Sequence, residues 1–185
     1  MSAKDSSPRA VAIGKSAPAT EKPSSREPLA ILIVEDDAND ALLLKLAFAT
    51  AGVRAPVHLV GDGIEAMAYL KGAPPFGDRA MHPPPDLLVL DLKMPRADGF
   101  EVLAWMQQRP GRERLTLAVL TGSCSQADIN RAYSLGADFC LNKRLDFRQL
   151  VDLVRQLATK CSIPLLLDPA DLQSHAPRRL PGPGG

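Results

Sequence analysis

The sequence predicts an α/β fold in which helices cover both faces of a doubly wound, five-stranded parallel sheet. Between residues 29 and 160, short apolar runs alternate five times with longer stretches of helical spacing. Right-handed crossovers place the intervening helices on the faces of a sheet, so this strict alternation is typical of a parallel sheet buried on both sides. Glycine or proline closes several of the segments, as expected where the chain must turn.

Each predicted strand is a short apolar run, and each predicted helix repeats its apolar residues at a helical period. The strands are expected at residues 29–34, 56–60, 86–90, 115–120 and 138–142. The helices are expected at residues 40–52, 62–72, 98–108, 125–137 and 146–160. The first helix ends at Gly52, and the second begins at Asp62 and ends at Gly72. A proline-rich loop, residues 73–85, precedes the third strand, and Asp98 caps the helix that follows it.

Composition favours a soluble intracellular protein, and we expect a cytoplasmic one. Of the 185 residues 45% are hydrophobic, enough for one buried core with tails. The net charge of +1 creates no bulk attraction to nucleic acid or to a membrane surface. No apolar run approaches the length of a transmembrane helix, and the start of the chain lacks the apolar centre of a signal peptide. The three cysteines show no metal-ligand spacing and are typical of reduced thiols.

The folded domain is expected to span residues 29–160, between two tails. Residues 1–28 are rich in Ser, Pro, Ala and Lys without an apolar period, and we predict that they are disordered. Residues 161–185 end in a Pro/Gly-rich stretch and are predicted to be mostly flexible. Four apolar residues within 162–169 nevertheless need cover, either from the domain or from a second chain.

Charged and polar side chains follow the predicted strands at their carboxyl ends, where open parallel sheets bind ligands. Glu35 and Asp36 follow the first strand, Asp91 the third, Thr121 the fourth and Lys143 the fifth. If the first and third strands are neighbours, the three carboxylates converge and repel, which raises their pKa values unless a cation intervenes. Lys143 supplies one positive charge, and a divalent ion such as Mg²⁺ would supply two more.

Such a set of groups can surround a phosphoryl group. Asp91 would be the nucleophile and form an acyl phosphate. Mg²⁺, Lys143 and Thr121 would hold the equatorial oxygens, because phosphoryl transfer depends mainly on positioning and electrostatics. Each residue alone has a simpler explanation, as a strand-end cap, a surface charge or a loop cap. The prediction therefore depends on the whole set.

Four segments resemble, in their order and spacing, the receiver domain of two-component response regulators. These segments are ILIVEDDAND, VLDLKMPRADG, AVLTGS and GADFCLNK, all within residues 29–160. The resemblance implies a flavodoxin-like (βα)5 fold with strand order 2-1-3-4-5. The long loop before the third strand and the opening VEDDANDALLL are most similar to stand-alone regulators of the phytochrome-associated type.

The resemblance also implies two sets of site residues. Those expected to bind Mg²⁺, or alternatively Mn²⁺, are Glu35, Asp36, Asp91 and the backbone carbonyl of Lys93. Those expected to take part in the phosphoryl chemistry are the phospho-acceptor Asp91 together with Thr121 and Lys143.

The implied function is that of a single-domain response regulator, phosphorylated by a histidine kinase or a histidine phosphotransfer protein. Such a protein catalyses its own phosphorylation and dephosphorylation and is not otherwise an enzyme. Few residues follow the last predicted helix, so we expect no DNA-binding domain and an output through protein contacts. A homodimer through the fourth helix, fifth strand and fifth helix is a further expectation.

Two positions depart from the family pattern in the region that reports phosphorylation. Arg144 follows Lys143 where the family usually has a cis proline, so this bond is either trans, with the lysine aimed differently, or strained. Cys140 stands where the family usually has a Tyr or Phe that turns inward, and Phe139 faces the other side of the strand. The alternative function is therefore a phosphorylation-independent adaptor with an altered switch.

Two other hypotheses are weaker. Residues 61–66 match a dinucleotide-binding pattern, but they lie on the second βα unit, and Asp62 and Gly63 are explained by a turn and a helix cap. A haloacid-dehalogenase-like phosphatase would need a second aspartate two residues after Asp91, where this chain has Lys93.

Overall fold

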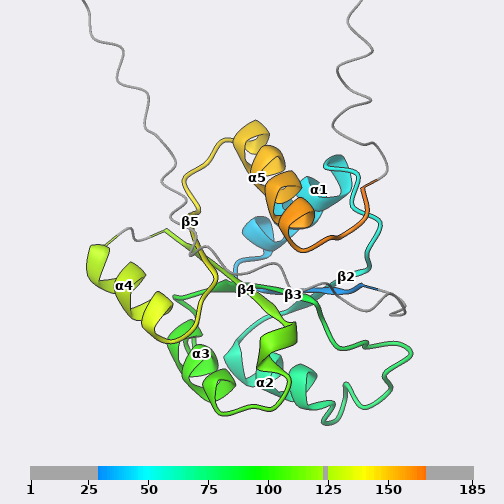
Figure 1. Ribbon diagram of the computed structural model, residues 1–185, viewed down its shortest axis with the longest axis vertical. Helices are drawn as coiled ribbons and strands as arrows, with labels where there is room; N and C mark the ends of the chain where they lie inside the picture. The colour runs from blue at the N-terminus through cyan, green and yellow to red at the C-terminus, as the bar shows by residue number, and fades with distance from the viewer. Residues whose placement is uncertain (1–28, 123–124, 166–185) are drawn as a thin grey trace, which may run out of the picture.

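The sheet has the predicted topology. The computed structural model describes residues 29–122 and 125–165, and in this part of the chain five parallel strands follow the order β2-β1-β3-β4-β5 (Figure 1). The strands are β1 (Ile31–Val34), β2 (Val57–Val60), β3 (Leu87–Asp91), β4 (Thr116–Thr121) and β5 (Phe139–Asn142). In the register of β1 and β3, Val34 lies opposite Leu90. The residues that follow these two strands therefore start side by side.

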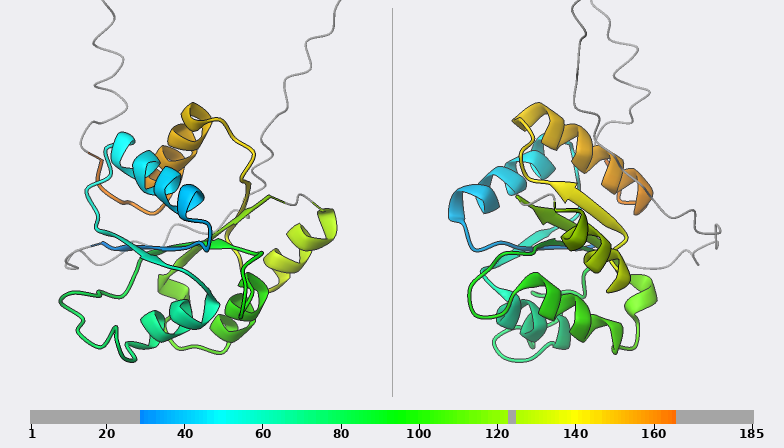
Figure 2. Two further views of the ribbon diagram at one scale, coloured as in Figure 1. Left: turned by 180° about the vertical axis from the view of Figure 1, so that it is seen from behind. Right: turned by 90° about the vertical axis from the view of Figure 1, so that its left-hand side faces the viewer.

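The described helices form two layers, one on each face of the sheet (Figure 2). They are α1 (Ala38–Thr50), α2 (Gly63–Lys71), α3 (Gly99–Gln107), α4 (Gln126–Ser134) and α5 (Phe147–Lys160). A short 3-10 helix, Arg112–Arg114, precedes β4. Helices α1 and α5 cover one face, while α2, α3 and α4 cover the other (Figure 1).

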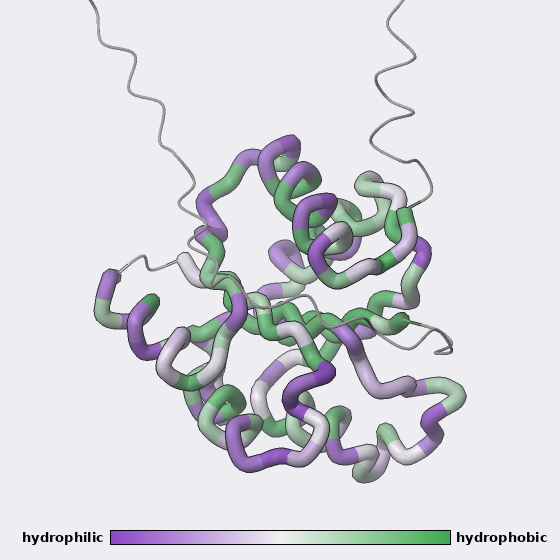
Figure 3. Tube along the Cα trace, viewed as in Figure 1, coloured by the Kyte–Doolittle hydropathy of each residue, from purple (hydrophilic) through white to green (hydrophobic). Residues whose placement is uncertain are grey.

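Alternate strand residues point into two separate cores. Ile31 and Ile33 of β1 pack with α1 and α5, whereas Leu32 and Val34 pack with the helices of the other face. The central strand β3 is buried along its whole length. Figure 3 shows the hydrophobic residues concentrated along the strands between the helix layers. This two-sided burial explains why the strands are continuous apolar runs.

Capping side chains fix the helix ends, within a few residues of the predictions. Asp62 and Asp98 cap α2 and α3 as predicted. Helix α1 begins earlier than predicted because the Asp37 carboxylate accepts hydrogen bonds from backbone N–H groups of its first turn. Helix α4 ends before residue 137 because Gly136, with φ of 94°, turns the chain out of the helix.

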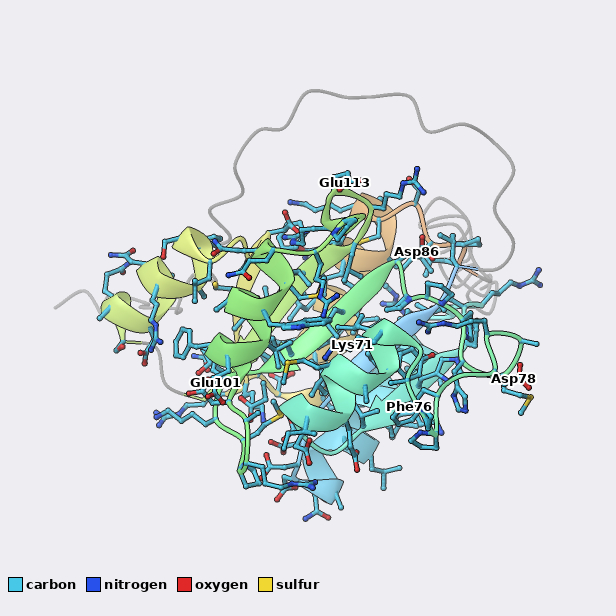
Figure 4. The ribbon with its side chains drawn as sticks, turned by 90° about the horizontal axis from the view of Figure 1, so that it is seen from below. Lys71, Phe76, Asp78, Asp86, Glu101 and Glu113 are labelled. Carbon is cyan, nitrogen blue, oxygen red and sulfur yellow. The ribbon has the colours of Figure 1, made fainter. Side chains whose placement is uncertain are left out.

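The proline-rich segment between α2 and β3 is a loop, as predicted, and it is attached to α2. The Arg79 guanidinium donates to the carbonyl oxygen of Tyr69 over 2.9 Å, and the Tyr69 hydroxyl donates to that of Pro83 over 3.1 Å. The Phe76 ring lies 5.2 Å from the Tyr69 ring between centroids, whereas Asp78 is exposed at the outer end of the loop (Figure 4).

The packed domain continues past residue 160. Cys161 and Ile163 are each 3% exposed and belong to the core under α1 and α5, and Leu165 forms an antiparallel bridge with Val53. Part of the apolar stretch at 162–169 is therefore covered by the domain itself. The tails predicted at residues 1–28 and beyond 165 lie outside the described residues. None of the described helices is both long and apolar enough to span a membrane.

Gly99, at the start of α3, is packed against the end of β3. A β-carbon at this position would lie 2.8 Å from Leu92 Cα and closer still to the Asp91 carbonyl oxygen. Because backbone atoms cannot move aside cheaply, we expect Gly99→Ala to lower the free energy of unfolding by about 2–3 kcal/mol in urea denaturation. Gly61→Ala is the control, since its β-carbon would have only an ordinary contact of 3.7 Å. Equal stability of the two variants would contradict this packing.

Candidate metal and phosphorylation site

Three carboxylates meet at the carboxyl edge of the sheet. Glu35 directly follows β1, Asp36 comes next, and Asp91 is the last residue of β3. One carboxylate oxygen from each lies within 4.8 Å of the others, so the predicted convergence is confirmed. Glu35 and Asp91 are buried, whereas Asp36 is exposed. Oxygen ligands at this spacing fit a divalent metal ion.

Lys143 reaches this cluster from the carboxyl end of the edge strand β5. Its backbone N–H donates to the Thr121 carbonyl oxygen over 3.0 Å, which holds the residue beside the end of β4. Its Nζ lies 2.6 Å from Glu35 Oε2 and 2.9 Å from Asp91 Oδ2. The Lys143–Arg144 bond is trans, because the one cis bond in the described part of the chain joins Pro74 and Pro75. The lysine thus reaches Asp91 without a proline after it.

Burial and charge shift the protonation of this cluster. Burial raises the pKa of Glu35 above 4.5, against the hydrogen bond and positive charge of Lys143, and the negative charge of Asp91 adds to the rise. Burial alone would lower the pKa of Lys143, but its hydrogen bonds to Glu35 and Asp91 and their charges raise it above 10.5 overall. At neutral pH the lysine is therefore a fixed cation among carboxylates whose repulsion it only partly offsets.

Thr121 and Lys93 lie at the carboxyl ends of β4 and β3, as predicted. Thr121 ends β4 and is 2% exposed, one residue beyond Leu120, the partner of Asp91 in the sheet register. Lys93 is exposed, and its backbone N–H donates to Asp91 Oδ1 over 3.3 Å. The roles of the Thr121 hydroxyl and the Lys93 carbonyl remain predictions.

The loop after β3 is fastened to the start of α2. Arg96 has a φ of 69° and forms an ion pair with Asp62, which is fully buried. The N–H of Gly63 donates to the Ala97 carbonyl oxygen over 3.2 Å. A β-carbon on Gly63 would lie 2.6 Å from that oxygen, so this turn is filled by protein and has no space for a pyrophosphate. The dinucleotide-binding hypothesis is not supported.

Phe139 and Cys140, in the reporting region, point to opposite faces of β5, as predicted. Phe139 packs with the α1 and α5 core beneath Lys160, whose Nζ lies 4.8 Å from the ring centroid. Cys140 packs against the other core. Burial raises the pKa of the Cys140 thiol to about 11, against a hydrogen bond with Tyr133 of α4. The Cys140 thiol is therefore protonated, and an aromatic side chain from α4 lies beside it.

Asp40 and Tyr133 are neighbours of the site that sequence reasoning missed. Asp40 Oδ2 lies 3.2 Å from Lys143 Nζ. Its one sequence signal is an acidic residue in the first turn of α1, which the helix dipole explains equally well. Tyr133 carries no separate signal because it lies within an ordinary helical pattern.

One cavity lies away from these carboxylates. It has a volume of about 600 Å³ and lies between the ends of α2 and α3 and the segment before β3, near Lys71 and Asp86 (Figure 4). No residue of the carboxylate cluster lines it.

Known proteins share this fold and sequence pattern. Response regulator Rcp1 of Synechocystis is 34% identical over 131 residues, which cover 71% of this chain and 87% of Rcp1. The structure of RPA3017, a response regulator in red light signalling of R. palustris, matches with a TM-score of 0.66 and 34% identity, over 71% of this chain and 92% of that one. The phosphorylated cyanobacterial phytochrome response regulator RcpA matches with a TM-score of 0.65 and 33% identity, over 75% and 99% of the two chains.

These likenesses confirm the expected similarity to phytochrome-associated response regulators. Rcp1 has also been solved in an Mn²⁺-bound form, which matches with a TM-score of 0.64 and 30% identity over 76% of this chain and all of that one. A family model described as the response regulator receiver domain matches residues 31–155. The chain therefore belongs to the response regulator receiver family.

Proposed function

We propose that this protein is a single-domain response regulator that accepts a phosphoryl group on Asp91 from a histidine kinase or histidine phosphotransfer protein. The observation that carries the proposal is the position of Lys143 Nζ, 2.9 Å from a buried Asp91 that also belongs to a carboxylate cluster of metal-binding size. We further propose that it acts in the cytoplasm, as a signalling protein rather than as an enzyme with a separate substrate.

In the proposed reaction an Asp91 carboxylate oxygen attacks the phosphorus of the donor's phosphohistidine. The P–N bond breaks, and its electron pair stays on the imidazole nitrogen of the departing histidine. Mg²⁺, held by Glu35, Asp36, Asp91 and the Lys93 carbonyl, would neutralise charge on the phosphoryl oxygens. Lys143 pairs with one equatorial oxygen, and the Thr121 hydroxyl donates to another. Burial of Asp91 limits the access of water to the acyl phosphate.

We propose that the output is a protein contact through α4, β5 and α5, and that a homodimer forms there. In the reporting region, Phe139 is held in the opposite core, and Cys140 stands where the family usually has an aromatic residue. That arrangement favours a second candidate, an adaptor whose contacts do not depend on phosphorylation. A partner that binds with the same Kd with and without beryllofluoride would support the second candidate.

Incubation with Mg²⁺ and acetyl phosphate tests the acceptor directly. Intact-mass spectrometry should show one added phosphoryl group on the wild-type protein and none on Asp91→Asn, because the amide cannot act as the nucleophile. Asp78→Asn changes an exposed loop carboxylate and should be phosphorylated like the wild type. If Asp91→Asn still gains a phosphoryl group, the acceptor is another residue.

Substitution of two adjacent aspartates, Asp36 and Asp37, tests metal binding separately from helix capping. Asp36→Asn should weaken Mg²⁺ or Mn²⁺ binding by about tenfold or more in calorimetry, since even outer partners of metal ligands contribute roughly ten- to hundredfold. Asp37→Asn should bind normally, because asparagine also caps helices and Asp37 lies outside the cluster. Equal losses in both variants would argue against Asp36 as a ligand.

The raised pKa of Glu35 predicts a pH dependence of stability in metal-free buffer. The native state binds more protons than the unfolded state between pH 4.5 and the folded pKa, so the contribution of Glu35 to stability is full below 4.5 and is lost as the pH rises through the folded pKa. The stability of Glu35→Gln relative to the wild type should therefore increase across this window. Glu113→Gln, at an exposed position, should show no such trend.

A further inference from the structure

Asp40, in the first turn of α1, is the third carboxylate bound to Lys143. Its Oδ2 lies 3.2 Å from Lys143 Nζ, compared with 2.9 Å for Asp91 and 2.6 Å for Glu35. An ammonium group has three N–H donors, so these three carboxylates can take one each. The Asp40 side chain is 47% exposed and the Lys143 side chain only 16%. The contact therefore closes the solvent side of a largely covered lysine.

The side chains beside the Asp40–Lys143 ion pair are apolar. A small cavity of about 20 Å³ beside Asp40 and Lys143 is otherwise lined by Leu43, Leu44, Leu120 and Leu150. Solvent screens an ion pair less effectively against such walls than in open water. The helix turn that carries Asp40 is also fixed, because the Asp37 carboxylate accepts the Asp40 backbone N–H over 3.0 Å.

Asp40 differs from the other two partners in one respect. Glu35 and Asp91 belong to the cluster that fits a divalent ion, whereas Asp40 does not. A bound metal would take part of the negative charge of Glu35 and Asp91 away from the lysine. Asp40 is then the carboxylate that can still hold the Lys143 ammonium beside the acceptor.

We propose that Asp40 is a positioning residue that keeps the Lys143 ammonium next to Asp91 while a phosphoryl group is received. This inference rests on the proposed function of Asp91. Two simpler roles compete with it. In the first, Asp40 acts only on the N-terminus of α1, which it stabilises through the helix dipole. In the second, its negative charge acts mainly by repelling an incoming phosphoryl group. The first role would change only stability, and the second would make removal of Asp40 accelerate phosphorylation.

The test measures the rate of phosphorylation by acetyl phosphate and the Kd of beryllofluoride, both with Mg²⁺. Asp40→Ala should slow the reaction and weaken beryllofluoride roughly three- to tenfold, the effect of losing one partly exposed charged hydrogen bond. Asp40→Glu should recover part of the loss. Asp78→Ala is the control, because it removes an exposed carboxylate from the loop before β3, outside the carboxylate cluster and the proposed contact surface. It should behave like the wild type.

Coupling to the lysine distinguishes positioning from a structural role. In a Lys143→Met background, Asp40→Ala should have no further effect on the Kd of beryllofluoride. The wild type, the two single variants and the double variant should also be compared in the presence of a chelator. There, the effects of the two substitutions on the free energy of unfolding should be non-additive. An unchanged or faster Asp40→Ala protein, or an equal loss in the Lys143→Met background, overturns the proposal. If the wild type neither reacts nor binds beryllofluoride, the proposed function itself fails.

Discussion

The structure depends on one electrostatic constraint, the crowding of carboxylates at the carboxyl edge of a parallel sheet. Glu35 and Asp91 are almost fully buried, and a buried carboxylate is strongly unfavourable without a partner. Lys143 is within 3.2 Å of both of them and of Asp40. One lysine cannot balance these carboxylates and Asp36 together, so the folded protein keeps a site with excess negative charge. That excess, in a cluster of this size, fits the binding of a divalent cation.

The fold supplies the rigidity that holds these charges together. β1 and β3 are central strands, and their register places Glu35 and Asp91 side by side whatever their repulsion. The loop after β3 is tied down separately, by the Arg96–Asp62 ion pair and by the close approach of Gly99 to β3. The repulsion is therefore balanced by contacts outside the cluster, which hold Asp91 in one geometry without a ligand.

The sequence predicted the parts of this arrangement that leave a local or periodic pattern. Apolar runs located the five strands, and the polar residues at their ends located Asp91 and Lys143. The Asp40–Lys143 contact spans 103 residues and joins a helix start to a strand end, so no local pattern marks it. The length of α4 was overestimated because the sequence alone does not show that Gly136 adopts a positive φ. Tyr133 was missed because its partner Cys140 lies on another element.

The two proposed functions of the site, receiving a phosphoryl group and reporting it, depend on different kinds of structure. Asp91 is placed by the backbone of β3, at the centre of the sheet, whereas the ammonium of Lys143 also has a partner on a helix, Asp40 of α1. A report of phosphorylation instead requires a side chain with two packed arrangements. Phe139 lies under Lys160 on the face opposite α4, so its rotation cannot fill the space beside Cys140. If α4 responds to phosphorylation, the aromatic group positioned to move is Tyr133, because it belongs to α4 and already contacts Cys140.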